Sequence, residues 1–174
     1  MEVFGWLLLA AILVLSPLSW IKPSPGQKKL AVLREEARKL GIKVTLTPLK
    51  LKDGSKLQGA AYRWLRPPEA PVMPGYLCLL RKDTEVAQPP GEPWDEDWKL
   101  IQGQRSFLTE AQQQALNAWL AELPHNVFAL EWGSATLALW WDERKAADIL
   151  PSWHQTAQAL LALPCKKPGE SNWR

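Results

Sequence analysis

The chain is poor in the residue types that many enzyme and metal sites use. Its 174 residues include two cysteines and two histidines: Cys78, Cys165, His125 and His154. The cysteines are 87 residues apart and form no Cys-x-x-Cys pair, so they do not suit a zinc site. The histidines occur in no His-Glu-x-x-His setting. These shortages predict no metal site, no cofactor and no identifiable catalytic residue.

Other signatures of catalysis are absent as well. The sequence has no P-loop, no glycine-rich dinucleotide fingerprint and no Gly-x-Ser-x-Gly. Cys78 lies in the apolar run of residues 76–80, where a buried and inert thiol is the usual state. His125 and His154 are interpreted as surface or satisfied histidines. We therefore expect a non-catalytic protein, although missing motifs do not exclude an enzyme of unknown class.

Charge is absent from residues 3–21, a run that ends at Lys22. A helix of this length is about 28 Å long, close to the bilayer's hydrocarbon thickness of about 30 Å. Trp6 and Trp20 lie near its ends, where they suit the two membrane interfaces. A cleaved signal peptide needs a basic start and small residues before its cut, and a core helix is rarely apolar on every face. We expect residues 1–22 to be an uncleaved, single transmembrane anchor.

Positive charge is concentrated directly behind this segment. Residues 22–56 hold ten Lys and Arg against three acids, a net of +7, whereas residues 57–174 hold eleven against fourteen, a net of −3. Lys and Arg close to a span mark its cytoplasmic side, so we expect the N-terminus outside and the domain in the cytoplasm. The alternative is a reversed anchor with a periplasmic domain. Because the second part is acidic, no nucleic-acid partner is expected.

Residues 23–41 predict a basic juxtamembrane helix that is amphipathic. Apolar residues recur at helical spacing over residues 27–40, and Gly41 follows at the C-cap position. The candidate lipid-surface residues are Lys22, Lys28, Lys29, Arg34, Arg38 and Lys39. Each cation near an anionic surface contributes about 1 kcal/mol, so anionic lipid head groups are an expected partner. The alternative is that the apolar stripe packs on the domain behind it.

Residues 42–164 predict an α+β domain with a mostly antiparallel sheet and helices packed on one face. Strands are expected at residues 42–46, 58–65, 76–80, 98–102, 127–132 and 135–141, and helices at 110–123 and 147–163. Thr109 and Gln112 form a capping box before the first of these helices. Residues 165–174 are expected to be a flexible tail.

Tryptophan is unusually frequent, with eleven residues in the chain. Trp119, Trp132, Trp140 and Trp153 fall on predicted apolar faces and are expected in the core. Trp140 and Trp141 are adjacent on a strand, so their side chains point to opposite faces. One of the two therefore lies on a less buried face, or is covered by a partner or by the final helix.

Residues 83–97 are rich in proline and predict a loop with an acidic cluster at its end. A calcium loop needs spaced ligands and a glycine, which this cluster lacks. We interpret the cluster as a solvated loop. The alternative is a partner-docking segment, since tryptophans flanked by acids can anchor in a basic groove. Its candidate residues are Trp94, Asp95, Glu96, Asp97 and Trp98.

The first forty residues combine a single span with a charged helix, joined by the sequence IKPSPGQKK at residues 21–29. This arrangement is similar to the YajC-type accessory subunit of the bacterial preprotein translocase. The whole chain resembles uncharacterised single-span inner-membrane proteins of gammaproteobacteria. The resemblance implies a membrane-anchored accessory or interaction domain of an inner-membrane assembly, with a membrane protein as partner. A membrane-bound enzyme of unknown class and a lipid-surface sensor acting through the basic helix are the alternatives.

Overall fold

The computed structural model describes residues 5–6, 24–51, 53–70, 72–84, 89–144 and 147–166. The chain divides into two compact units, Met1–Val32 and Leu33–Arg174, so the division falls inside a helix. Among the described residues, no helix combines the length and the apolar character that crossing a membrane requires. The span expected over residues 3–21 lies outside them, apart from Gly5 and Trp6, and so does the tail after Lys166. The anchor therefore stays a prediction.

Helix α2 (Pro25–Lys39) is capped at both ends by local hydrogen bonds. Ser24 Oγ accepts from the Gln27 amide at 3.2 Å, and Gln27 Oε1 accepts from the Ser24 amide at 2.9 Å. This reciprocal pair is a capping box, which starts the helix two residues earlier than expected. At the other end Gly41 has a φ of 75° and its amide bonds to the Arg38 carbonyl, which confirms the predicted C-cap.

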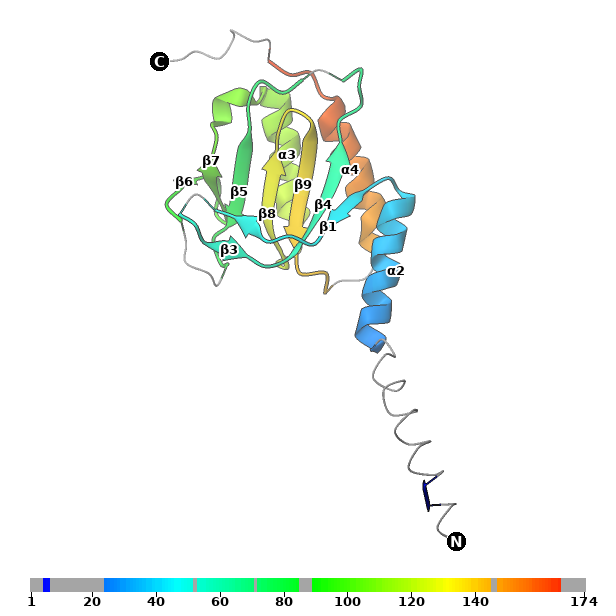
Figure 1. Ribbon diagram of the computed structural model, residues 1–174. Coiled ribbons are helices and arrows are strands. Elements are labelled where there is room, and N and C mark those ends of the chain that lie inside the picture. The colour runs from blue at the N-terminus through cyan, green and yellow to red at the C-terminus, as the bar shows by residue number, and fades with distance from the viewer. Residues whose placement is uncertain are drawn as a thin grey trace. The chain divides into compact units, whose positions relative to one another are not determined.

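Seven strands form one sheet in the order β1-β4-β9-β8-β5-β7-β6, and every pairing in it is antiparallel (Figure 1). The strands are β1 (Lys43–Thr45), β4 (Ala60–Leu65), β5 (Leu77–Arg81), β6 (Glu92–Pro93), β7 (Trp98–Gln102), β8 (Val127–Trp132) and β9 (Thr136–Trp141). Each strand expected from hydrophobic alternation is present, with its ends within two residues of the prediction. The predicted α+β class with a mostly antiparallel sheet is confirmed.

Two helices lie behind this sheet in Figure 1. Helix α3 (Glu110–Glu122) starts at the predicted capping box of Thr109 and Gln112. Helix α4 (Leu150–Ala162) follows a short 3₁₀ turn and carries Pro151 in its first turn, where a missing backbone donor costs least. Both helices match their expected positions, since one face of each is apolar at helical spacing.

Tryptophan contacts join these helices to the sheet. The ring of Trp119 on α3 lies 6.0 Å from that of Trp64, and Trp153 on α4 lies 4.9 Å from Trp141, both edge to face. Tyr62 meets Trp141 in the same way at 5.1 Å. Large aromatic rings bury much apolar surface and favour this geometry, so they account for much of the helix-side core.

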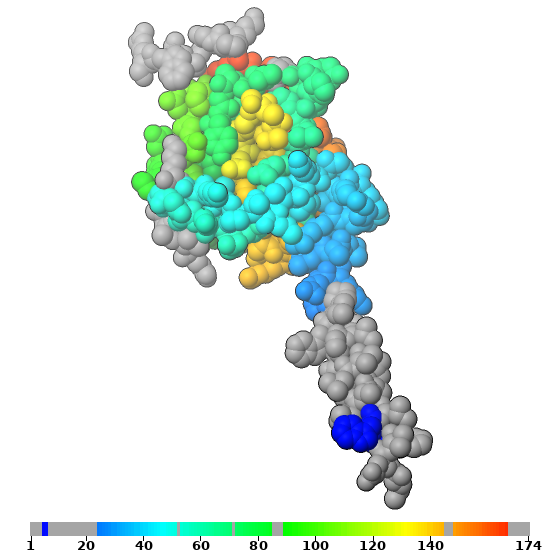
Figure 2. Space-filling model, in the orientation of Figure 1, coloured from blue at the N-terminus to red at the C-terminus, as the bar shows by residue number. Residues whose placement is uncertain are grey.

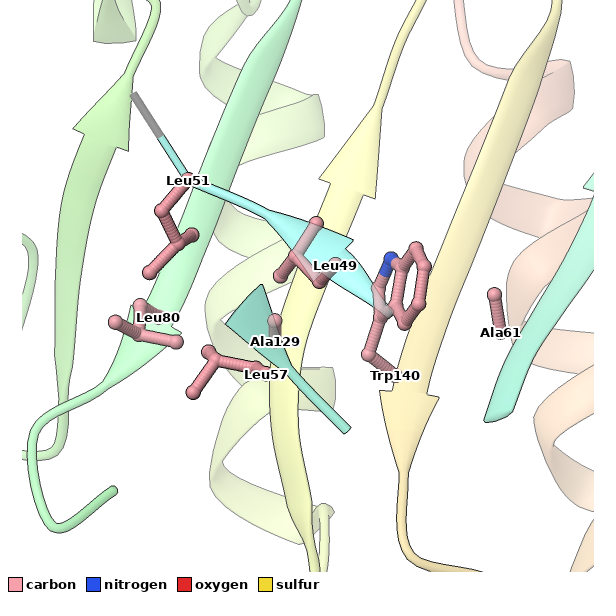
Figure 3. Close-up of a cluster of buried hydrophobic side chains, with 7 residues drawn as sticks. All are labelled: Leu49, Leu51, Leu57, Ala61, Leu80, Ala129 and Trp140. Atoms are coloured by element: carbon pink, nitrogen blue, oxygen red, sulfur yellow. The ribbon is translucent and has the colours of Figure 1, made fainter. Parts of the chain in front are cut away.

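The opposite face of the sheet is covered in part by a second, two-stranded sheet, β2 (Leu49–Lys50) and β3 (Lys56–Leu57). Figure 3 shows leucines of this hairpin above Trp140 of β9. Trp140 and Trp141 are only 2% and 0% exposed. The sequence predicted that one of the two adjacent tryptophans would lie on a less buried face unless another element covered it. The hairpin covers Trp140, and neither a partner nor the final helix is needed for this.

The turn at Asp53 and Gly54 closes this small hairpin. Gly54 has a φ of 82°, and Asp53 Oδ1 accepts from the Ser55 amide at 2.9 Å. Pro48 separates β1 from β2, because proline cannot donate to a sheet ladder. Only after β3 does the chain rejoin the main sheet as β4, which pairs with β1 and β9.

Candidate functional site

The second half of α2 is part of the folded domain. Leu33 and Ala37 are buried. Arg34 donates to the Glu143 carboxylate from Nε at 2.9 Å and from Nη2 at 2.5 Å, and the Tyr62 hydroxyl donates to it at 2.9 Å. The bond with Glu143 raises the pKa of Arg34, while burial raises the pKa of Tyr62. The part of the apolar stripe that Leu33 and Ala37 form therefore packs on the domain.

Two further basic residues of α2 are paired with acids on the same helix. Arg38 lies 2.8 Å from Glu35, and Lys39 lies 2.7 Å from Glu36. The hydrogen bond with Glu36 raises the pKa of Lys39. Both pairs are exposed and local, so each contributes little to stability and partly cancels the charge presented to a surface.

The remaining candidates for lipid contact lie at the start of α2. Lys28 and Lys29 are exposed, and neither makes an ion pair within the part of the chain that the structure describes. Lys22 lies outside the described residues. Since Arg34 is used by the domain, the uncompensated positive charge of the described helix is confined to these two lysines.

The two tryptophans of the predicted docking segment are buried in the domain. Trp94 is 6% exposed, and its Nε1 donates to Asn117 Oδ1 at 2.8 Å. The Arg105 guanidinium lies over its ring at 4.1 Å. Trp98 is 1% exposed, with Arg81 at 4.6 Å from its ring centre. Anchoring a partner with either ring would require its removal from the core.

The acids between them form an exposed turn that joins β6 to β7. Asp95 Oδ1 accepts from the amides of Asp97 and Trp98 at 2.9 and 2.8 Å. Lys82 Nζ donates to the carbonyls of Asp95 and Glu96. Asp95 thus holds the turn, whereas Glu96 is exposed and the Asp97 carboxylate lies 3.8 Å from Arg81 Nη1.

The described histidines and cysteines form no recognisable catalytic arrangement. The His125 side chain is 85% exposed and lies 3.6 Å from the Asp83 carboxylate, whose side chain is 59% exposed. His154 is half-buried on α4, Cys78 is buried and Cys165 is half-buried; neither cysteine forms a disulfide bond with a described residue. Across residues 24–166, as far as these are described, no three His, Cys, Asp or Glu side chains group as a metal site.

A polar row crosses the face of the sheet that carries the hairpin. The strand register aligns Arg63 on β4, Ala138 on β9, Glu131 on β8 and Cys78 on β5. The Tyr76 hydroxyl donates to Glu131 at 2.8 Å, and Arg63 Nη2 lies 3.8 Å from the same carboxylate. Figure 2 looks onto this face, where the cyan segment crosses the strands and the ends of β8 and β9 stay uncovered. We call this uncovered part, which carries Arg63, Leu65 and Glu131, the open face.

A cavity of about 270 Å³ adjoins the polar row, and we call it the hairpin cavity. It is lined by Leu49, Lys50, Leu51, Asp53, Tyr76, Cys78, Pro89, Pro90, Ile101 and Gln102. Burial raises the pKa of Cys78 to about 12 and also raises the pKa of Tyr76. Because both groups are neutral at ordinary pH, the cavity is suited to binding rather than to nucleophilic attack.

A second cavity, of about 440 Å³, lies beside β3, the start of β8 and the end of β9. It is lined by Lys56, Leu57, Gln58, Asp83, Thr84, His125, Asn126, Phe128, Asp142 and Arg144. Asn126 Nδ2 donates to Asp142 at 3.0 Å, and Arg144 pairs with the same carboxylate at 2.9 Å. Charges of both signs meet in this wide opening, so it favours no single ligand charge.

Sequence reasoning missed the polar row. Arg63 and Glu131 are each the single charged residue of an otherwise apolar strand, which was the available signal. Their meeting depends on the register of strands far apart in the sequence, which alternation alone does not give.

Comparison with known proteins adds no further residue to the site. No family model matches the chain, and neither a curated protein nor a solved structure matches it. The fold and the site are thus argued from this chain's own residues, and the resemblance to the YajC-type subunit and to single-span inner-membrane proteins stays a prediction.

Proposed function

We propose that the chain is a non-catalytic accessory domain, anchored in the bacterial inner membrane by residues 3–21, that binds a membrane protein of the same bilayer from the cytoplasmic side. The observation that carries this proposal is the attachment of α2 to the domain. Arg34 binds Glu143, and Leu33 and Ala37 are buried. Because the second half of α2 is part of the domain, the anchor tethers the domain to the bilayer, which raises its effective concentration near a membrane partner.

The protonation state of the groups on the sheet face favours binding over catalysis. A thiol with a pKa of about 12, as burial gives Cys78, is almost entirely protonated at neutral pH, and the thiolate is the nucleophile. The Tyr76 hydroxyl is held neutral by burial and donates to Glu131. These groups serve hydrogen bonding and packing. The alternative of a membrane-bound enzyme therefore has less support.

The open face is the surface that we assign to the partner. Leu65 is 58% exposed, and it shares this face with Arg63, because residues two apart on a strand point the same way. Arg63 and Glu131 are partly exposed beside it. An apolar contact flanked by both charge signs fits a partner surface with a central aliphatic or aromatic side chain and a mixed polar rim.

Site-specific photocrosslinking in cells tests this assignment. A photoreactive residue replaces Leu65 in the full chain, and a matched variant carries it at Ala118, which is exposed on α3. We expect a discrete adduct with one membrane protein from position 65 and none from position 118. The same adducts from both positions, or none from position 65 in folded, membrane-bound protein, contradict the proposal.

The orientation has its own test. A reporter fused after Arg174 is expected to be active in the cytoplasm, as the basic residues behind the anchor predict. Periplasmic reporter activity contradicts this orientation without bearing on the fold.

Lipid-surface sensing is the second candidate function, and the position of Lys28 and Lys29 favours it. Both lysines stand at the membrane-proximal end of α2 in sequence, and neither has an acidic partner in the described ranges. Cations near an anionic leaflet are attracted by about 1 kcal/mol each. The two functions are compatible, because they use different residues: Lys28 and Lys29 for the lipid surface, and Arg63, Leu65 and Glu131 for the protein partner.

A further inference from the structure

The hairpin cavity has apolar walls and a polar inner end. Leu49 and Leu51 come from the hairpin, and Ile101 comes from β7. Pro89 and Pro90 add a further apolar wall, while Lys50 and Asp53 are exposed and of opposite charge. A volume of about 270 Å³ equals about nine water molecules at about 30 Å³ each, just below the range of about 300–1,000 Å³ for ligand pockets.

The side chains that line the inner end, Tyr76, Cys78 and Gln102, carry no charge. Cys78 is 2% exposed and its thiol stays protonated, and the Tyr76 hydroxyl is already bonded to Glu131. An ionic group placed here has no partner of opposite charge among Tyr76, Cys78 and Gln102, and burying an unpaired charge is costly. The inner end of the cavity therefore selects against charged groups.

Gln102 supplies the polar group that is still available. Its side-chain amide has two donors and one acceptor, and it makes no hydrogen bond to any described residue. The residue is half-buried at the end of β7, where the register places it beside Cys78. A ligand in the cavity can thus satisfy an amide that the fold leaves unpaired.

We infer that the hairpin cavity is a binding site for a small, uncharged and mostly apolar molecule that forms one hydrogen bond with the Gln102 amide. Contact with Leu49, Leu51 and Ile101 removes apolar surface from water on both sides, which supplies the affinity. The single amide fixes the orientation of the ligand. This site does not depend on the proposed membrane partner, because it lies under the hairpin rather than on the open face.

Fluorine NMR with 5-fluoroindole tests the inference on the full chain in mild detergent. This probe is neutral, has ten heavy atoms and carries one N–H donor. We expect saturable binding above the detergent background, and binding at least tenfold weaker for 5-fluoroindole-2-carboxylate, which carries a charge. Absence of saturable binding, or equal affinity for the two probes, overturns the inference.

Three variants locate the site. Cys78→Leu fills the inner end and is expected to weaken binding at least tenfold. Gln102→Leu removes the amide from a half-buried position that tolerates it, and is expected to weaken binding about threefold to tenfold. Thr84 lines the other cavity, so Thr84→Leu should leave binding of the probe unchanged. A loss of near-ultraviolet circular dichroism in Cys78→Leu shows that this variant is misfolded, and the test then depends on Gln102→Leu alone. If Gln102→Leu binds the probe with unchanged affinity, the inference is contradicted.

Discussion

Arg34 and Glu143 form a bidentate ion pair across 109 positions of sequence, with donor–acceptor distances of 2.9 and 2.5 Å. The pair joins α2 to the segment after β9. Glu143 is 8% exposed and has a φ of 58°, a left-handed conformation that costs a residue with a side chain about 1–2 kcal/mol. The two guanidinium bonds and the Tyr62 hydroxyl offset this cost. The side-chain hydrogen bonds of Arg34 and Tyr62 therefore meet at one carboxylate.

The first prediction concerns the stability that this pair contributes. Glu143→Gln and Arg34→Gln should each lower the free energy of unfolding by about 1.5–3 kcal/mol, because each leaves a charged or polar partner unsatisfied. The double variant should lose less than the sum, as expected for groups in direct contact. Urea denaturation of the full chain in mild detergent measures all three. Arg38→Gln is the control: its exposed pair with Glu35 predicts a change within about 0.5 kcal/mol. An effect of Glu143→Gln no larger than this control contradicts the role of the pair.

The second prediction is a loss of stability in alkali. The folded chain keeps the Cys78 proton up to a pKa of about 12, whereas an unfolded thiol loses it near about 8.5. Between these values the folded state binds more protons than the unfolded state. The free energy of unfolding therefore falls as pH rises through this window, by at most about 1.4 kcal/mol per pH unit. The effect is absent at lower pH.

Cys78→Ala isolates this contribution. Denaturation curves between pH 8 and pH 10 should show a steeper decline for the natural sequence than for the variant. Below about pH 8.5, the pKa of the thiol in the unfolded chain, the difference in the free energy of unfolding between the two chains should not change with pH. Parallel declines across the whole range mean that the folded thiol ionises freely, against its position in the hairpin cavity.

Long elements could be predicted because one face of each is buried. The helix over residues 147–163 and the hairpin over 127–132 and 135–141 show clear periods of 3.6 and 2, and the structure has them at these positions. Capping chemistry located the start of α3 at Thr109. The capping box of Ser24 and Gln27 was not used in the prediction, which relied on the apolar spacing over residues 27–40.

Short elements and distant pairings escaped prediction for physical reasons. Strands β2 and β3 have two residues each, too few for an alternation pattern, so the cover of Trp140 was not foreseen. Trp94 stands in a proline-rich stretch that suggested solvent exposure. Its burial depends on Asn117 and Arg105, which are remote from it in the sequence. Local composition does not contain such contacts.

The third prediction tests the hairpin as a core element. Leu57 and Leu49 are 3% and 4% exposed, and replacing either by Ala should lower the free energy of unfolding by about 2–5 kcal/mol. Leu46→Ala, at a position that is 58% exposed, should stay within about 0.5 kcal/mol. Urea denaturation distinguishes these outcomes. Equal and small effects at all three positions mean that the hairpin does not cover Trp140 in solution.

The fourth prediction separates turn structure from partner docking in the acidic segment. Asp95→Ala should lower the free energy of unfolding by about 1 kcal/mol, because its carboxylate accepts two backbone amides. Glu96→Ala should leave stability unchanged, since this side chain faces solvent. The adduct yield from a photoreactive group at Leu65 is then compared in the two variants. A loss of adduct with Glu96→Ala supports docking through the acids, and an unchanged yield counts against it.

The last prediction concerns the lipid contact of α2. Neutralising Lys28 and Lys29 together as Lys28→Gln and Lys29→Gln should weaken attraction to an anionic leaflet by about 2 kcal/mol, because each cation contributes about 1 kcal/mol. Arg38→Gln with Lys39→Gln removes the same formal charge. It should have a smaller effect, since those cations are paired with Glu35 and Glu36. A nitroxide at Val32, which is 59% exposed, reports immersion through its collisions with oxygen.

The measurement compares the full chain in vesicles with and without phosphatidylserine. Oxygen accessibility at Val32 should rise with anionic lipid in the natural sequence and in the paired-residue variant, and should not rise in the variant without Lys28 and Lys29. Added salt should reduce the rise, because surface charges are screened over about 8–10 Å at physiological ionic strength. Equal responses of the two variants mean that the uncompensated lysines have no special role, and sensing through α2 is then rejected.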